Sequence, residues 1–227
     1  MRRWSLAVVL LIVTANVHAL KSVPPTDTNL AGRWTVNVAQ SDDGEALLAK
    51  RREKQMQEMR REEERRRRRL EQDPFAWEPE FTPPERTPQR IAEMEERERR
   101  THQMLGLTKS LQIEQDERGA RLTITSDFET RRLDAGARSQ VSLPQGQLAD
   151  AEYGWEGEWF VIERASRGGP RITEKYRRLK KTDQLELLVT IKGSSFLAGM
   201  KVRRIFDRAP AEARAPPPGA DVMGPVR

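Results

Sequence analysis

The sequence predicts a mainly β protein in which an antiparallel meander of about eight to ten strands closes into a barrel or a sandwich, with a charged helical hairpin inserted after the first strand. Three observations predict this fold. Segments of alternating apolar and polar residues recur roughly every 8–12 residues, which is typical of antiparallel strands. Only short turns separate these segments after residue 107. Residues 42–106 have instead the composition of solvated helices.

The alternating segments are expected to build the barrel from residues 20–41 and 107–208. The first, at 33–38, has an apolar residue at every second position, beginning with Trp34. The clearest lies near 184–191, where four apolar residues share one face: Leu185, Leu187, Val189 and Ile191. The other strands are expected near residues 111–113, 122–124, 129–133, 141–143, 151–155, 159–164, 171–179 and 200–206. Closure into a barrel removes exposed sheet edges.

Residues 42–106 are expected to form an insertion of two charged helices joined by a Pro-rich linker. Asp42, with Glu45 three residues later, predicts a capping box at the start of the first helix. Thr87 followed by Pro88 predicts the start of the second helix. Because apolar residues are scarce in both helices, we expect a barrel in which a short Gly-Ser bridge replaces them to remain folded.

The two ends of the chain are expected to lie outside the folded unit. Arg2 and Arg3 precede an apolar run, and Val17-His18-Ala19 is a small-x-small site, as in a secretory signal peptide. The apolar run is shorter than the roughly 20 residues of a membrane span. We therefore expect cleavage after Ala19 and a periplasmic or secreted mature form without a transmembrane anchor. Residues 209–227, rich in Pro, Ala and Gly, predict a disordered tail.

The sequence carries few of the residues that catalysis usually needs. It has no Cys, and after removal of the signal peptide His102 is the one His that remains. Disulfides, thiol nucleophiles and multi-His metal sites are thereby excluded. We expect His102 to be a surface residue, and the same holds for two carboxylate pairs on strands: Asp127 with Glu129, and Asp150 with Glu152. The sequence thus predicts a protein that is not an enzyme and has no catalytic residues, cofactor or metal.

The charges are concentrated in the insertion. The formal net charge is +6, and Lys50–Asp73 alone holds eleven cations and seven anions. The run Arg65–Arg69 could attract a protein partner or an anionic surface. Glu62–Glu64 partly neutralise that run, and an exported protein does not meet nucleic acid as an obvious partner. We therefore expect a solvated charged helix. A protein or anionic-surface partner for the helical arm is the alternative, and nucleic acid is not expected.

Aromatic residues between 153 and 160 are candidate contacts for a ligand or a partner. If Trp159 and Phe160 lie in one strand, they point to opposite faces. One of the two side chains can then fill the barrel, while the other must be covered by the helices or by a ligand. Trp155, and Trp77 of the linker, join them as candidate contacts. Core packing and a ligand-lined cavity mouth both remain open for this cluster.

The head of the first strand resembles a known family. Gly32-Arg33-Trp34 resembles the G-x-W signature of lipocalins, and residues 32–41 resemble the opening of small exported bacterial lipocalin-like proteins of unknown function. Similar landmarks follow within residues 107–208: Leu111-x-Ile113-x-Gln115, Trp155-Glu156-Gly157, Thr173-Glu174-x-Tyr176 and Arg203-Arg204-Ile205-Phe206-Asp207-Arg208. The resemblance implies a β-barrel and no established activity. It also implies that Arg203 or Arg204 packs over Trp34 as a cation–π contact. The structural signature is therefore Gly32, Trp34, Arg203 and Arg204.

Two functions remain open at this point. The first is a non-catalytic exported protein that acts in binding or envelope interactions through its barrel and its charged helical arm. The second is a carrier that holds a small hydrophobic ligand in the barrel. The barrel interior distinguishes them, because seven side chains would leave a ligand no room if they fill it: Trp34, Val36, Leu122, Ile124, Phe160, Leu187 and Val189.

Overall fold

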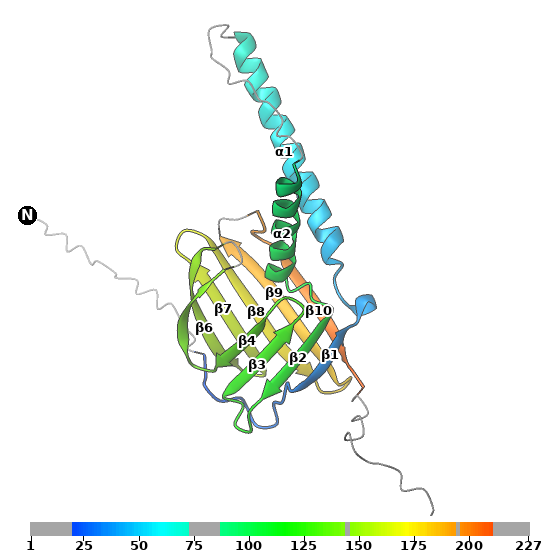
Figure 1. Ribbon diagram of the computed structural model, residues 1–227, viewed down its shortest axis with the longest axis vertical. Coiled ribbons are helices and arrows are strands. Elements are labelled where there is room, and N and C mark those ends of the chain that lie inside the picture. The colour runs from blue at the N-terminus through cyan, green and yellow to red at the C-terminus, as the bar shows by residue number, and fades with distance from the viewer. Residues whose placement is uncertain (1–19, 73–86, 144–145, 194–195, 211–227) are drawn as a thin grey trace, which may run out of the picture.

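A computed structural model describes residues 20–72, 87–143, 146–193 and 196–210. It shows one sheet of ten antiparallel strands and two helices between the first and second strands, which confirms the predicted fold class (Figure 1). The strands are β1 Gly32–Val36, β2 Ser110–Gln115, β3 Arg121–Ser126, β4 Thr130–Asp134, β5 Arg138–Ser142, β6 Leu148–Glu156, β7 Trp159–Ser166, β8 Pro170–Leu179, β9 Gln184–Gly193 and β10 Lys201–Arg208. The helices are α1 Gly44–Gln72 and α2 Pro88–Met104, and a short 3-10 turn, Val38–Gln40, follows β1.

The strands form a meander that curls until its two ends meet. Their order is β4-β3-β2-β1-β10-β9-β8-β7-β6-β5, so the long-range pair β1–β10 joins the beginning of the chain to its end. Beyond β4, the amide of Gly136 donates to the carbonyl of Tyr153 in β6 at 2.7 Å. Lys21 pairs with Trp155 through two backbone hydrogen bonds of 2.8 and 3.0 Å. The two end strands of the sheet order, β4 and β5, are themselves joined by the short turn of residues 135–137.

The inward face of the sheet carries the core. Residues that stand opposite one another in paired strands share a face, and the registers place one continuous apolar set inside. Each member is at most 3 % exposed: Trp34, Leu111, Ile113, Leu122, Ile124, Phe160, Ile162, Ile172, Tyr176, Leu185, Leu187, Val189, Ile191, Val202 and Phe206. Side chains with so little accessible surface leave no room for a ligand between them. Among the described residues, the barrel interior is therefore filled.

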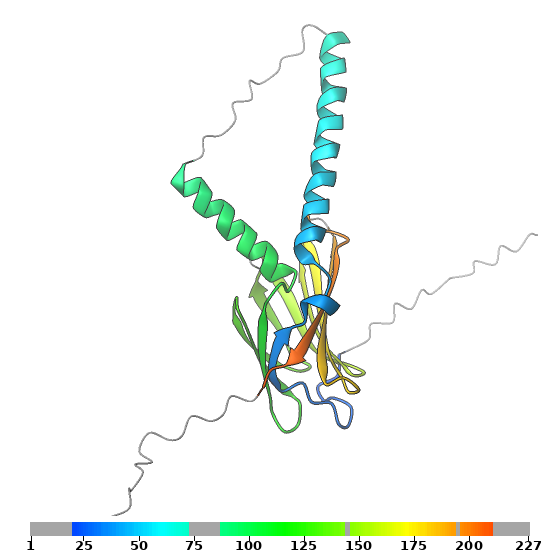
Figure 2. The same cartoon turned by 90° about the vertical axis from the view of Figure 1, so that its right-hand side faces the viewer.

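The start of α1 and the end of α2 close one end of the barrel (Figure 1). Leu48 in α1, Met104 at the end of α2 and Leu105 just after it belong to the core and are at most 1 % exposed. Gly106 has a φ of +64°, and a Cβ added there would lie 3.0 Å from side-chain atoms of Leu187 and Val189. The expectation that the helices add nothing to the core was therefore wrong. The ends of the helices nearest the barrel supply core residues, whereas their outer turns are exposed and diverge (Figure 2).

The segment before β1 runs across the opposite end (Figure 1). Its residue Leu30 is fully buried, and the Leu30 amide donates to the side chain of Gln115 at 2.9 Å. The indole nitrogen of Trp34 donates to the carbonyl of Leu30 at 3.1 Å. Pro24 lies so close to the β2–β3 turn that a Cβ on Gly119 would approach it to 2.4 Å. Both ends of the barrel are thus covered by the chain itself.

The start of α1 differs from the predicted capping box. The side chain of Asp43, rather than that of Asp42, accepts from the amide of Ala46 at 3.0 Å. Asp42 instead accepts from the backbone amide of Arg203 at 2.7 Å, which anchors the chain to β10 just before the helix begins. The start of α2 is confirmed, because the hydroxyl of Thr87 accepts from the amide of Arg90.

The cation over Trp34 is also not the expected one. Arg208 lies 4.4 Å from the ring centroid, whereas we expected Arg203 or Arg204. The reason is register: Trp34 stands opposite Arg208 in the β1–β10 pair, so the two side chains share a face. Arg203 faces outward and binds Glu186, and Arg204 donates to the carbonyl of Thr108 at 3.1 Å.

These contacts predict that the outer turns of α1 and α2 can be deleted, whereas the ends of the helices that pack on the barrel cannot. A chain in which a Gly-Ser bridge replaces residues 60–90 should have a free energy of unfolding within about 0.5 kcal/mol of that of the full mature chain, because the described residues that it loses, 60–72 and 87–90, are almost all exposed. Leu48→Ala should cost about 2–5 kcal/mol, the usual cost of emptying a buried leucine site. Urea melts measure both, with exposed Leu148→Ala as the matched control. A silent Leu48→Ala, or loss of a cooperative melt on shortening, would contradict this account.

Candidate functional site

A cluster of charged side chains lies inside the barrel. Arg131 points inward from β4, Arg164 from β7, and Glu174 and Tyr176 from β8. The Arg131 guanidinium donates two hydrogen bonds to the Glu174 carboxylate, at 2.9 and 3.0 Å, and Arg164 also donates to that carboxylate. The Tyr176 hydroxyl donates to Glu174 at 2.7 Å. One carboxylate thus accepts from two guanidinium groups and a phenol.

The charges of this cluster compensate one another. Burial raises the pKa of Glu174, but the positive charges of Arg131 and Arg164 outweigh burial and lower the pKa to about 2. Burial, together with the charge of Glu174, raises the pKa of Tyr176 above its usual range. The carboxylate is therefore ionised and the phenol neutral near neutral pH. Glu129 adds a second carboxylate at 3.4 Å from Arg131. The Nε atoms of Arg131 and Arg164 are buried without a hydrogen-bond partner, but both guanidinium groups bind the Glu174 carboxylate. The ion pairs link β4, β7 and β8, so we assign the cluster a structural part in the barrel.

The predicted aromatic contacts separate into two environments. Trp155 and Phe160 lie in the core, edge to face, with ring centroids 5.2 Å apart. The indole nitrogen of Trp155 donates to the carbonyl of Gly119 at 2.9 Å. Trp159 points to the outer face, where Arg177 covers its ring at 4.2 Å. Trp77 lies outside the described residues. The structure therefore gives Trp155 and Phe160 core positions and leaves Trp159 partly exposed beneath an arginine.

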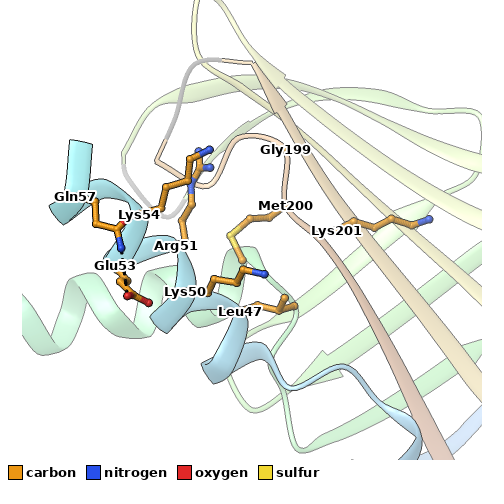
Figure 3. Close-up of a pocket in the computed structure, with 9 residues that line it drawn as sticks. All are labelled: Leu47, Lys50, Arg51, Glu53, Lys54, Gln57, Gly199, Met200 and Lys201. Carbon is orange, nitrogen blue, oxygen red and sulfur yellow. Dashed lines mark hydrogen bonds between the residues drawn. The ribbon is translucent and has the colours of Figure 1, made fainter. Parts of the chain in front are cut away.

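A groove on the outside of the barrel is the best candidate for a binding site. It has a volume of about 570 Å³ and lies between the first turns of α1 and the turn from β9 to β10 (Figure 3). Its lining residues are Leu47, Lys50, Arg51, Glu53, Lys54, Gln57, Gly199, Met200 and Lys201. The helix is positioned there because buried Leu48, on its first turns, fixes it to the end of the barrel.

Arg51 joins the two walls of the groove. Its guanidinium donates to the carbonyl oxygens of Phe196 and Ala198, at 2.9 and 3.2 Å. These hydrogen bonds hold the β9–β10 turn against α1 and fix the guanidinium charge at the end of the groove. Because Arg51 is tied to neutral carbonyls, no carboxylate among these contacts cancels its charge.

The groove is cationic over a partly apolar floor. Lys50 extends toward Met200 and Leu47, and Lys54 lies beside Arg51 (Figure 3). Glu53 is the one acidic side chain of the lining, while the side chain of Lys201 extends away from α1 (Figure 3). Lys54 also lies 3.9 Å from Glu58, a neighbour on the same helix. Positive charges beside apolar surface suit a molecule with a negatively charged head and an apolar body.

The groove was not predicted from the sequence. The cationic run considered there as a partner surface, Arg65–Arg69, lies on the exposed outer part of α1. The signal that could have indicated the groove is Leu47-Leu48, the apolar pair at the start of an otherwise polar helix. One residue of that pair enters the core and the other lines the groove.

The chain matches no protein-family model and no curated protein. Among solved structures it is similar to the Echinococcus granulosus fatty-acid-binding protein 1, with 11 % identity over 79 % of this chain and 96 % of that chain, and a TM-score of 0.41. It is also similar to human cRBP IV, with 15 % identity over 80 % and 98 % of the two chains and a TM-score of 0.41. Caenorhabditis elegans lipid binding protein 8 has 14 % identity over 79 % and 94 %, and a TM-score of 0.39. The function is therefore argued from the side chains of this protein.

No helix in the described part of the chain combines the length and the apolarity needed to cross a membrane.

The buried carboxylate predicts a specific acid sensitivity. Glu174→Gln leaves Arg131 and Arg164 buried without their shared counter-charge and should destabilise by about 3–5 kcal/mol at neutral pH. An unfolded Glu174 has an ordinary pKa of 4.5 and the folded one a pKa of about 2. Its stabilisation is therefore complete above pH 4.5 and lost as the pH falls through about 2. The variant should lack this part of the acid dependence.

Urea melts of both proteins between about pH 7 and pH 3 measure the difference. Glu152→Gln is the matched control, because Glu152 pairs with exposed Arg138 and its loss should cost no more than about 1 kcal/mol. Equal stability of Glu174→Gln and Glu152→Gln would show that the interior cluster does not hold the barrel.

Proposed function

We propose that the protein is an exported, non-catalytic binding protein of the cell envelope, which holds an anionic amphiphile in the groove between α1 and the β9–β10 turn. The observation that carries this proposal is the cationic lining of Lys50, Arg51 and Lys54 above apolar Leu47 and Met200. The volume of about 570 Å³ lies within the usual range for small-molecule sites, roughly 300–1,000 Å³.

The filled barrel directs the ligand to this groove. A ligand held in the interior would have to displace core side chains that are at most 3 % exposed, such as Phe160 and Val189. A groove on the outside requires no such displacement. The carrier hypothesis is therefore proposed here with its ligand bound at the junction of helix and barrel.

The chemistry of the lining supports binding rather than catalysis. Among the residues that the structure describes, the lining offers charge and apolar surface and contains no Ser, Thr, Cys or His that could act as a nucleophile with a neighbouring base. The surplus of cations along α1 extends the positive potential outward and favours the approach of anions. Export through the signal peptide, which lies outside the described residues, would place the groove where it meets envelope lipids and fatty acids.

The proposal predicts a charge-dependent affinity for a long-chain fatty acid. Oleate should bind the mature chain, and Lys50→Gln with Lys54→Gln should weaken binding at least tenfold, because two of the charges at the carboxylate are removed. Titration calorimetry, below the concentration at which oleate forms micelles, measures the affinity. Oleyl alcohol, which has the same chain without the charge, should bind weakly and equally to both proteins.

The matched control is Lys180→Gln with Lys181→Gln. This pair carries the same charge in the β8–β9 turn, at the other end of β9 from the groove. It should leave the oleate affinity unchanged. If both double variants bind oleate alike, or if oleyl alcohol binds as tightly as oleate, the groove is not a site for an anionic amphiphile.

A further inference from the structure

The two helices are joined at their base by a pair of polar contacts between described residues. A guanidinium nitrogen of Arg52 lies 3.1 Å from a carboxylate oxygen of Glu98. The Nε2 atom of His102 lies 2.9 Å from a carboxylate oxygen of Glu45. Glu98 and His102 are four residues apart on α2, so they share the face that looks toward α1.

Three of these side chains place metal-binding atoms together. The Nε2 or Nδ1 atom of His102 and one carboxylate oxygen each of Glu45 and Glu98 lie within 4.8 Å of one another. A change of side-chain rotamer at the two exposed glutamates is enough to bring all three onto one ion. One imidazole with two carboxylates is a donor set that Zn²⁺ accepts.

A second observation concerns the imidazole itself. The Nε2 atom is shielded from solvent and has no hydrogen-bond partner of acceptable geometry, although Glu45 lies 2.9 Å away. The lone pair of an imidazole nitrogen is a ligand for borderline metal ions. A metal ion held between Nε2 and the two carboxylates would give this nitrogen the partner that it lacks.

We propose that Glu45, Glu98 and His102 form a binding site for a borderline divalent cation, best suited to Zn²⁺, which clips α1 to α2 at their base. Mg²⁺ and Ca²⁺ fit poorly, because both prefer oxygen ligands. Arg52 contacts one oxygen of Glu98 and orients the carboxylate, whose other oxygen can face the ion. Three protein ligands leave one position of the ion for water.

The site is independent of the groove. At 100° per residue, Glu45 and Arg52 lie on one face of α1, while Lys50 and Lys54 lie on the opposite side. The first pair looks toward α2, and the second toward the β9–β10 turn. Failure of the cation site would therefore leave the proposed ligand groove untouched, and the reverse also holds.

The test uses the untagged mature chain, in which His102 is the sole histidine. Calorimetric titration should show one Zn²⁺ bound per chain, with no comparable binding of Mg²⁺. The imidazole resonances of His102 should shift as Zn²⁺ is added, which gives a readout at the ligand itself. His102→Ala and Glu98→Gln should each weaken Zn²⁺ binding at least tenfold.

Glu93→Gln is the matched control, because Glu93 is an exposed carboxylate on the opposite side of α2 from Glu98. It should bind Zn²⁺ like the unchanged chain. Circular dichroism melts verify that each variant is folded. Absence of Zn²⁺ binding by the unchanged chain would overturn the proposal. Equal binding by His102→Ala would overturn it as well.

Discussion

The ion pair between Arg131 and Glu174 is the constraint on which the architecture depends. Arg131 lies on β4, one end strand of the sheet order, and Glu174 lies on β8, the fourth strand counted from the other end. Their bidentate contact crosses the interior and joins the two halves of the meander. Arg164 and Tyr176 complete the shell around the carboxylate. A charge buried this deeply is tolerated only while its partners stay in place, so the closed form of the barrel is favoured over forms that separate β4 from β8.

This constraint is the reason why we propose a binding site outside the barrel. The interior volume is divided between apolar side chains and the charged cluster, and both ends are covered, one by the ends of the helices nearest the barrel and the other by the segment before β1. The first turns of α1 bury Leu48 at the end of the barrel and place Lys50, Arg51 and Lys54 beside the β9–β10 turn. The stability of the barrel and the proposed ligand binding thus depend on different sides of the first turns of α1.

The strands could be predicted from the sequence, whereas the contacts that join distant strands could not. Alternation of apolar residues locates a strand such as β9, because it depends only on neighbours in the chain. Arg131 and Glu174 are 43 residues apart, and no local pattern indicates that they meet. The register of β1 against β10 likewise decides that Arg208, and not Arg203 or Arg204, covers Trp34. The core role of Leu48 was missed because a single buried residue in a charged helix does not create a periodic pattern.

The central claim is that the interior is closed and that ligand binds at the groove. Methyl NMR spectra of the mature chain, recorded with and without oleate, test it most directly. The account predicts that the methyl resonances of Leu47 and Met200, which line the groove, shift on addition of oleate. Those of Ile124, Ile162 and Ile172, which lie in the core, should stay in place. Shifts of the three isoleucine methyls, with Leu47 and Met200 unmoved, would show that the barrel opens to take the ligand inside and would contradict the account.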